Sequence, residues 1–446
     1  MQTPSRTTQD HHTGQGCAPR SGEPQRERTK GTAEHASGPW LIIIVLARTA
    51  LNTSYRIIYP FLPSIARGLG ISLPAAGGLV TLRMVAGMSA PLFGPVVDRH
   101  GRRRTMETAL LLVTLASLLL AGLGTVAATA AAFVLYGLAK VLYDTAAHAY
   151  VGDVVPYRER GRAVGLVELS WAGAWLLGVP ASGLLIERFG WRAPWAVLIV
   201  LGVLGAGLTH VGLPAAPRPA PRDDDRSPLV SLFATWRGLL RRRSIIVFLL
   251  TSLLLTLAIE VPFIVYGAWL ETTFGLSLTA LGLASTIVGL AEAAAELGAT
   301  IITDRLGKRR SVLVGLYGLT TSLVLLPWLP KLGLGPALAG VALMILTFEF
   351  GMVSLMPLAT ELAPEARASL LSLNFMAFSL SRVLGASIGG WLWQWRSLAL
   401  HTGVGAICAL AAALLLGRGL AERAGTSRAS GDRPAGHGEP GVRHLP

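Results

Sequence analysis

Apolar segments of about 20 residues recur along this chain and are separated by short polar stretches. A helix of that length crosses a hydrocarbon layer of about 30 Å. Strict alternation of apolar and polar residues, the sign of a membrane strand, is absent from these segments. The pattern therefore predicts an all-α membrane protein. Its twelve predicted transmembrane helices lie near residues 40–63, 74–94, 105–124, 131–153, 163–187, 191–212, 244–270, 278–302, 311–329, 336–361, 367–393 and 397–418.

One long polar insertion divides the apolar segments into two sets of six. It begins with a Pro-rich run, which is typical of a semi-rigid linker. Both ends of the chain are polar and poor in large apolar residues, a composition that leaves a segment disordered. The predicted units are a disordered tail over 1–38, a six-helix bundle over 39–212, a linker over 213–243, a second bundle over 244–420 and a disordered tail over 421–446.

Composition and charge fit a membrane protein. Hydrophobic residues make up 52% of the chain and charged residues only 14%, whereas soluble domains carry about 25% charged residues. The net charge of +14 would suggest a nucleic-acid partner in a soluble protein. Here the basic residues cluster in alternate loops, which the positive-inside rule places in the cytoplasm. We expect a multi-pass protein of the cytoplasmic (inner) membrane with both termini cytoplasmic, in contact with lipid and not with nucleic acid.

The two halves of the chain repeat a loop motif. Asp98-Arg99-His100-Gly101-Arg102 follows the second apolar segment, and Asp304-Arg305-Leu306-Gly307-Lys308 follows the eighth, 206 positions further on. Glycines 178 and 385, in the fifth and eleventh segments, are 207 positions apart. Matched landmarks at one offset indicate a duplicated six-helix unit. The two copies can pack as pseudo-symmetric bundles with a binding site between them.

The first copy identifies a family. "GPVVDRHGRRR", from Gly94 to Arg104, resembles the G-x-x-x-D-R-x-G-R-R signature of major facilitator superfamily transporters, and the second copy lacks the leading Gly. The resemblance covers residues 40 to 420 and implies a transporter that works by alternating access, not an enzyme. The predicted gating residues are Gly94, Asp98, Arg99, Gly101, Arg102 and Asp153, with Asp304, Arg305 and Gly307 in the second half.

These residue types suit a gate. Gly94 and Gly101 allow a tight turn and close approach. The Asp98 carboxylate suits a helix N-terminus, where the dipole favours an anion. The arginines can pair with an acid at the end of a neighbouring helix, and Asp153 is the candidate. Such a latch would hold the cytoplasmic side closed; the alternative is that Arg102 and its neighbours only set topology.

Ionisable side chains occur inside the predicted spans, where each costs about 2.5–3.5 kcal/mol on insertion scales. Lys140, Asp144 and His148 follow one another at four-residue intervals, so they share one helix face. Inside the predicted spans, the first half holds more basic residues and the second half holds more acidic residues. A central site between the halves would then have one basic and one acidic wall, and these charges would attract each other. The predicted substrate and proton pathway consists of Asn52, Arg56, Arg83, Lys140, Asp144, His148, Glu260, Glu349 and Arg382.

Proton coupling needs a carboxylate that can change its protonation. Burial favours the neutral form and a nearby cation favours the charged form, so Asp144 beside Lys140 is subject to both. Glu260 and Glu349 are alternative proton carriers. His148 is either a relay or a polar packing residue.

The sequence is compatible with three functions. Proton-coupled efflux of an amphipathic compound is preferred, because partial Gly motifs in the fifth and eleventh segments resemble those of drug–proton antiporters. Proton-coupled uptake of a polar or charged metabolite is the alternative, because Phe133 stands where such antiporters carry an Arg. A non-transporting membrane sensor or scaffold is the third. The sequence has no phosphate-binding loop and no metal-ligand spacing, so we expect no cofactor. The expected partners are a small-molecule substrate and protons, and the expected state is a monomer.

Overall fold

The computed structural model describes residues 38–89, 93, 97, 99–156, 159–214 and 228–419, and within them the regular structure is helical throughout. The first half contains α2 (Pro39–Arg56), α3 (Ile58–Leu69), α4 (Leu73–Gly87), α6 (Arg102–Leu118), η1 (Leu119–Leu123), α7 (Val126–Val154), α8 (Arg160–Gly173), η2 (Ala174–Gly178), α9 (Val179–Phe189) and α10 (Ala193–Gly212).

The second half begins with α11 (Pro228–Leu239), which lies where the linker was expected to end. It continues with α12 (Arg243–Phe263), α13 (Tyr266–Phe274), α14 (Leu278–Ala284), α15 (Thr286–Leu306), α16 (Lys308–Leu325), η3 (Leu329–Leu332), α17 (Leu334–Leu362), η4 (Pro364–Ala366), α18 (Arg367–Leu392), η5 (Trp393–Trp395) and α19 (Leu398–Gly419).

Ten of the twelve predicted spans are long and apolar enough to cross a membrane within the described residues. Nine are single helices or runs of two or three consecutive helical elements, and the tenth is α2 with α3, bent by 56°. The second predicted span is represented by α4, which has only 15 residues before the described part of the chain is interrupted. The ninth, α16, has 18 residues but begins with three basic residues. The count of twelve therefore stays a prediction.

The glycine of the repeated loop motif precedes a helix in each half. Gly101 precedes α6 with φ 85° and ψ 148°, and Gly307 precedes α16 with φ 85° and ψ 144°. This backbone conformation is strained for any residue with a Cβ. The motif glycine is therefore required by the turn in both copies, which explains why the repeat retains it.

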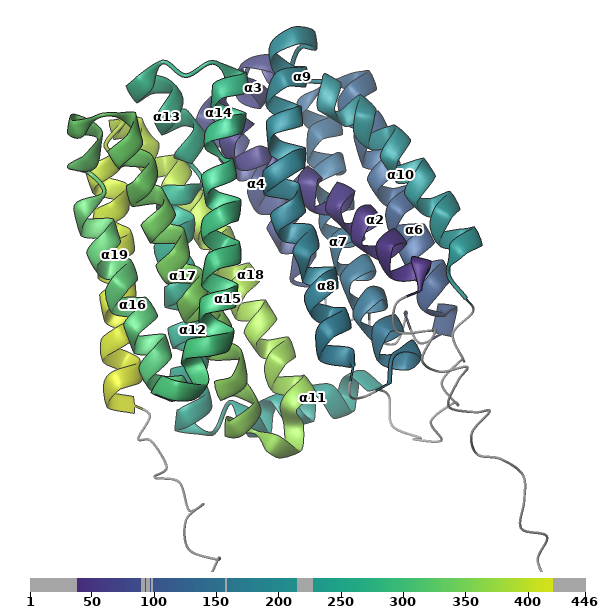
Figure 1. The fold of residues 1–446 in the computed structure, drawn as a ribbon, viewed down its shortest axis with the longest axis vertical. Coiled ribbons are helices and arrows are strands. Elements are labelled where there is room, and N and C mark those ends of the chain that lie inside the picture. The colour runs from purple at the N-terminus through teal and green to yellow at the C-terminus, as the bar shows by residue number, and fades with distance from the viewer. Residues whose placement is uncertain are drawn as a thin grey trace, which may run out of the picture.

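Helices of one half pack mainly on one another. The halves meet where α3 contacts α13 and α14, where α9 contacts α14, where α4 contacts α18 and η5, and where α15 contacts α8 and η2. Figure 1 shows α3, α9, α13 and α14 gathered at one end of the molecule, here called the α3 end, and α11 at the opposite α11 end. The closest approaches between the halves belong to the α3 end.

Glycines make this approach possible. A Cβ on Gly183 of α9 would meet the carbonyl oxygen of Leu278 at 2.5 Å, and one on Gly267 of α13 would overlap the carbonyl oxygen of Pro60 in α3. Backbones can come this close only where a side chain is missing. The α3 end is thus closed by direct backbone packing between the halves.

Candidate functional site

A buried ion-pair network occupies the first half. Arg48 of α2 is 2% exposed, and its Nε lies 2.9 Å from Asp144 Oδ1 of α7. Its Nη1 lies 3.0 Å from Glu168 Oε2 of α8 and also donates to Ser170 Oγ at 3.1 Å. A buried guanidinium needs such multiple partners, because an unpaired charge in low dielectric is costly. Arg48 therefore ties three helices of this half together.

The row Lys140, Asp144 and His148 belongs to the same network. Lys140 Nζ lies 2.7 Å from Asp144 Oδ2 and donates to Asn52 Oδ1 at 2.6 Å. His148 Nε2 lies 2.9 Å from Glu168 Oε1. The shared helix face expected from the spacing is thus turned toward α2 and α8. Asp144 carries a cation on each of its two oxygens.

Trp171 of α8 lies against three cations. The ring centroid is 4.1 Å from Lys140 Nζ, 4.5 Å from the guanidinium carbon of Arg56 and 5.8 Å from that of Arg48. Arg56 also faces Trp175, with its guanidinium carbon 4.9 Å from that ring centroid. A cation over an indole face is attracted by about 0.5–2 kcal/mol, more when both are desolvated. Arg56 therefore lies against two indole rings.

Two polar contacts join the halves next to this network. Arg56 Nη2 lies 2.6 Å from Glu292 Oε1 of α15, with side-chain exposures of 14% and 7%. Tyr59 of α3 donates through its hydroxyl to Glu260 Oε1 of α12 at 3.0 Å. Both acids come from the second half, as the opposite charge balance of the halves led us to expect. Arg56 thus connects the first-half network to an acid of the second half.

Arg83, Glu349 and Arg382 are placed near these contacts but are paired differently. Arg83 of α4 is fully buried, and its Nη1 donates to the carbonyl oxygen of Tyr55 at 3.1 Å. Glu349 of α17 and Arg382 of α18 make no ion pair within the described residues, although they lie within electrostatic range of each other. Nine predicted pathway residues are therefore divided between a paired network and a weakly paired group.

The predicted gate is described in part. Arg102 Nε lies 3.2 Å from Asp153 Oδ2, so the pair suggested from the sequence is present in this conformation. In the second half Lys308 Nζ pairs with Glu361 Oε1 at the equivalent loop. Arg99 and Arg305 are exposed. Gly94, Asp98 and the side chain of Asp304 lie outside the described residues.

Sequence reasoning left Arg48, Glu168 and Glu292 out of the pathway. The signal for Arg48 was its spacing of four and eight positions from Asn52 and Arg56, which places all three on one face of α2. Nothing in the sequence shows that this face meets Asp144 and Glu168, which lie 96 and 120 positions away.

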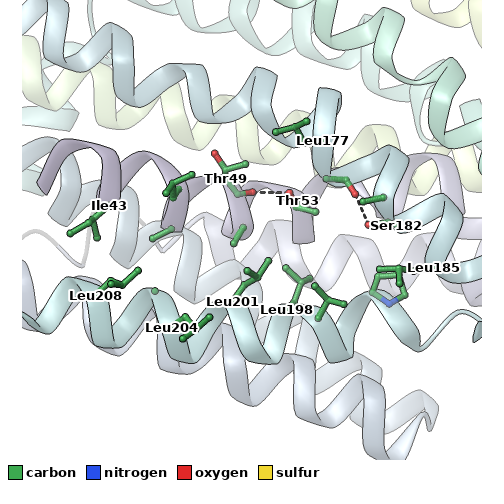
Figure 2. A pocket seen from close by; sticks show the side chains of 18 residues that line it. Ile43, Thr49, Thr53, Leu177, Ser182, Leu185, Leu198, Leu201, Leu204 and Leu208 are labelled. Carbon is green, nitrogen blue, oxygen red and sulfur yellow. Dashed lines mark hydrogen bonds between the residues drawn. The ribbon is translucent and has the colours of Figure 1, made fainter. Parts of the chain in front are cut away.

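An apolar groove lies on the opposite side of α2. It has a volume of about 410 Å³ between α2, η2, α9 and α10. Figure 2 shows Leu177, Leu198, Leu201 and Leu204 lining it, with Thr53 and Ser182 among them. Both hydroxyls donate to carbonyl oxygens of their own helix turns. Since a helix turns about 100° per residue, the groove face of α2 points away from Arg48 and Asn52. The groove is therefore separate from the ion-pair network.

No group of three or more His, Cys, Asp or Glu residues in the described ranges is arranged to hold a metal ion. The network instead consists of buried, paired charges that lie beside indole rings.

Comparisons with known proteins agree with this architecture. A family model described as Major Facilitator Superfamily matches residues 44–267 and 248–439. The chain is 23% identical over 379 residues to the uncharacterized MFS-type transporter YwfA of Bacillus subtilis (strain 168), covering 82% of this chain and 89% of that protein. It is 30% identical over 152 residues to multidrug resistance protein 2 of the same organism, covering 34% of this chain and 38% of that protein.

A solved structure, that of the D-xylose-proton symporter, matches with a TM-score of 0.70 at 17% identity, covering 86% of this chain and 97% of that one. At that identity the match shows a shared fold. Because the family model spans most of the chain, this protein belongs to the Major Facilitator Superfamily and is a multi-pass membrane transporter and not an enzyme.

Proposed function

We propose that this transporter exports an amphipathic small molecule across the cytoplasmic membrane in exchange for protons. The observation that carries the proposal is the position of Asp144, a carboxylate clamped between Arg48 and Lys140 inside the first bundle. A carboxylate in low dielectric needs either a cation or a proton. Withdrawal of Lys140 leaves Arg48 as the remaining cation beside Asp144, so Asp144 accepts a proton more readily, and the return of Lys140 favours release of that proton.

Lys140 has a second set of partners that could hold it away from Asp144. Its Nζ already contacts Asn52 Oδ1 and the face of Trp171. A substrate that displaces Lys140 from either partner would change the charge around Asp144. Binding of substrate and binding of a proton are then linked through one side chain.

Alternating access supplies the movement. The proposed arrangement is two six-helix bundles, twelve spans in all, that rock against each other, so that the central contacts Arg56–Glu292 and Tyr59–Glu260 break and form during the cycle. The α11 end, which carries the basic loops, faces the cytoplasm by the positive-inside rule. Closure of the α3 end by glycine packing then corresponds to a protein closed to the outside. The Arg102–Asp153 pair belongs to the gate at the cytoplasmic side.

Export is favoured by the partial similarity to multidrug resistance protein 2. Uptake of a polar or charged metabolite with protons is the second candidate, because the shared fold includes a proton symporter and the intramembrane arginines are numerous. Both candidates require flux of a solute.

The direct test uses an efflux-deficient bacterial host that expresses the wild-type protein or Asp144→Asn and is exposed to a panel of toxic amphipathic compounds. Export predicts resistance to some compounds with wild type and loss of that resistance with Asp144→Asn. Increased sensitivity together with accumulation of a solute would support uptake instead.

Liposomes then separate coupling from transport. For a compound found in the resistance screen, Asp144→Asn should still exchange substrate down its gradient but should lose accumulation driven by a pH difference. Unchanged pH-driven accumulation would refute the role of Asp144. Absence of flux under any gradient would leave a sensor or scaffold as the function.

A further inference from the structure

Arg83 is a buried cation that has no acidic hydrogen-bond partner in the part of the chain that the structure describes. The side chain is fully buried in α4, and its hydrogen bond goes to a neutral carbonyl oxygen of Tyr55. Its guanidinium carbon lies 4.1 Å from the Tyr55 ring centroid. Within the described residues, Nε and Nη2 have no hydrogen-bond partner. Two nitrogens of Arg83 thus present unused N–H groups inside the protein.

A second arginine faces the same place from the other half. Arg382 of α18 has a buried Nε without a partner among the described residues, and it lies in electrostatic range of Tyr59 and Glu260. Arg83 interacts electrostatically with the same two residues and with Arg382. Glu260 is 4% exposed and is hydrogen bonded to Tyr59. The buried Arg83 and the half-buried Arg382 therefore both lie near Glu260, which pairs closely with neither, and Glu349 is also in electrostatic range of Arg382.

The helices that carry the arginines meet across the two halves. α4 contacts α18, and Thr81 Oγ1 lies 3.3 Å from Ser387 Oγ on the side of Arg83 and Arg382 nearer the α3 end. The donors of Arg83 are buried in the present conformation. In the rocking movement proposed above, separation of α4 from α18 would expose them.

Guanidinium N–H groups without acceptors in the protein interior favour binding of an oxyanion. A buried cation whose N–H groups have no acceptor is unfavourable. Binding of an oxyanion that supplies the missing acceptors to Arg83 and Arg382 would therefore lower the free energy of the site. The planar fork of Arg matches a carboxylate, sulfonate or phosphate in a bidentate way. An organic cation would instead be repelled.

We propose that Arg83 and Arg382 form the binding site for an oxyanionic group of the transported molecule, and that Glu260 competes for the same two arginines. The proposal rests on the transport function described above and assigns its substrate class as amphipathic anions. Substrate and Glu260 then occupy the arginines alternately. Neutralising Glu260 strengthens binding of the anion.

Direct binding tests this with three compounds of one skeleton. The purified protein in lipid nanodiscs is titrated calorimetrically with 4-phenylbutyrate, 4-phenylbutanamide and 4-phenylbutylamine at constant ionic strength. The carboxylate should bind at least about tenfold more tightly than the amide, and the amine should bind most weakly. Equal binding of the three, or no binding of the carboxylate at millimolar concentration, overturns the proposal.

Three variants assign the effect to residues. Arg83→Met should weaken carboxylate binding by about tenfold or more, and Glu260→Gln should strengthen it. Arg103→Met is the matched control, because Arg103 belongs to the same half, lies outside the proposed site and pairs with Glu107 of its own half. It should bind the carboxylate as wild type does.

Thermal unfolding separates a binding role from a structural one. Arg83→Met without ligand should melt at the wild-type temperature or above it, because it removes an unpaired buried charge. A lower melting temperature together with unchanged carboxylate affinity would show that Arg83 only supports the fold. The binding measurement needs no gradient, so failure of proton-driven transport would refute the proposed coupling and leave the anion site standing.

Discussion

The Arg56–Glu292 pair gives the sharpest test of the movement between the halves. Arg56 is at the end of α2 and Glu292 is in α15, so the 2.6 Å contact exists only while the halves hold their present arrangement. Glu292→Gln keeps the shape of the side chain and removes its charge. We expect this variant to destabilise the conformation closed at the α3 end relative to the alternative.

The size of the effect follows from burial. Breaking a buried ion pair by removing one partner costs about 3–5 kcal/mol. Arg56 keeps its contacts with Trp171 and Trp175, each worth about 0.5–2 kcal/mol, so the lower end of the range applies. At about 1.4 kcal/mol for each factor of ten, a loss of about 3 kcal/mol changes the ratio of the two conformations by about two orders of magnitude.

Spin labels on either side of the α3 end would measure the change. Arg188 in α9 and Thr273 in α13 are exposed and belong to different halves. Pulsed electron–electron distances between labels on cysteines at these positions should be short in the wild-type background and longer with Glu292→Gln. Glu107→Gln is the control, since Glu107 pairs with Arg103 of its own half. An unchanged distance distribution in a folded Glu292→Gln protein would refute the reasoning.

Three further predictions use the same labelled protein or simple stability measurements. Gly267→Ala should also lengthen the distance at the α3 end, because its Cβ would overlap a backbone carbonyl of α3, whereas Gly78→Ala, with open space around it, should leave the distance unchanged. Asp144→Asn should lower the melting temperature in detergent by an amount corresponding to about 3 kcal/mol, since two cations lose their carboxylate, yet should not alter that distance. Asp153→Asn should change stability by about 1 kcal/mol or less, because its pair with Arg102 is partly exposed, and should still slow transport; a wild-type transport rate would contradict the gating role of the pair.

The order of helices could be predicted from the sequence because each apolar segment in a membrane must satisfy its backbone hydrogen bonds within its own helix. The departures have local causes. In α16 three basic residues occupy the first turn, so the helix is apolar over only its remaining length. In α2 and α3 one apolar segment is bent by 56°, with Pro60 just beyond the bend. Pro60 lacks the N–H that would continue the hydrogen-bond ladder of α2.

In the candidate site, only the contacts between residues of the same helix could be predicted from the sequence. Four-residue spacing correctly placed Lys140 and Asp144 within hydrogen-bonding distance, because both lie on α7. It could not reveal that Arg48 supplies the second cation, since that contact depends on how α2 packs on α7. Likewise the sequence could not reveal that packing brings Glu292 of α15 to Arg56.

Trp171 can serve as an intrinsic fluorescent probe of the transport cycle. Indole fluorescence depends on the electric field at the ring, and here three cations lie within 5.8 Å of the ring centroid. Departure of Lys140 toward another partner, or of Arg56 when the halves part, changes that field without any added label. In a background where the other tryptophans are replaced, the emission of Trp171 would follow both events in real time, and the order of the two spectral changes would reveal which event comes first in the transport cycle.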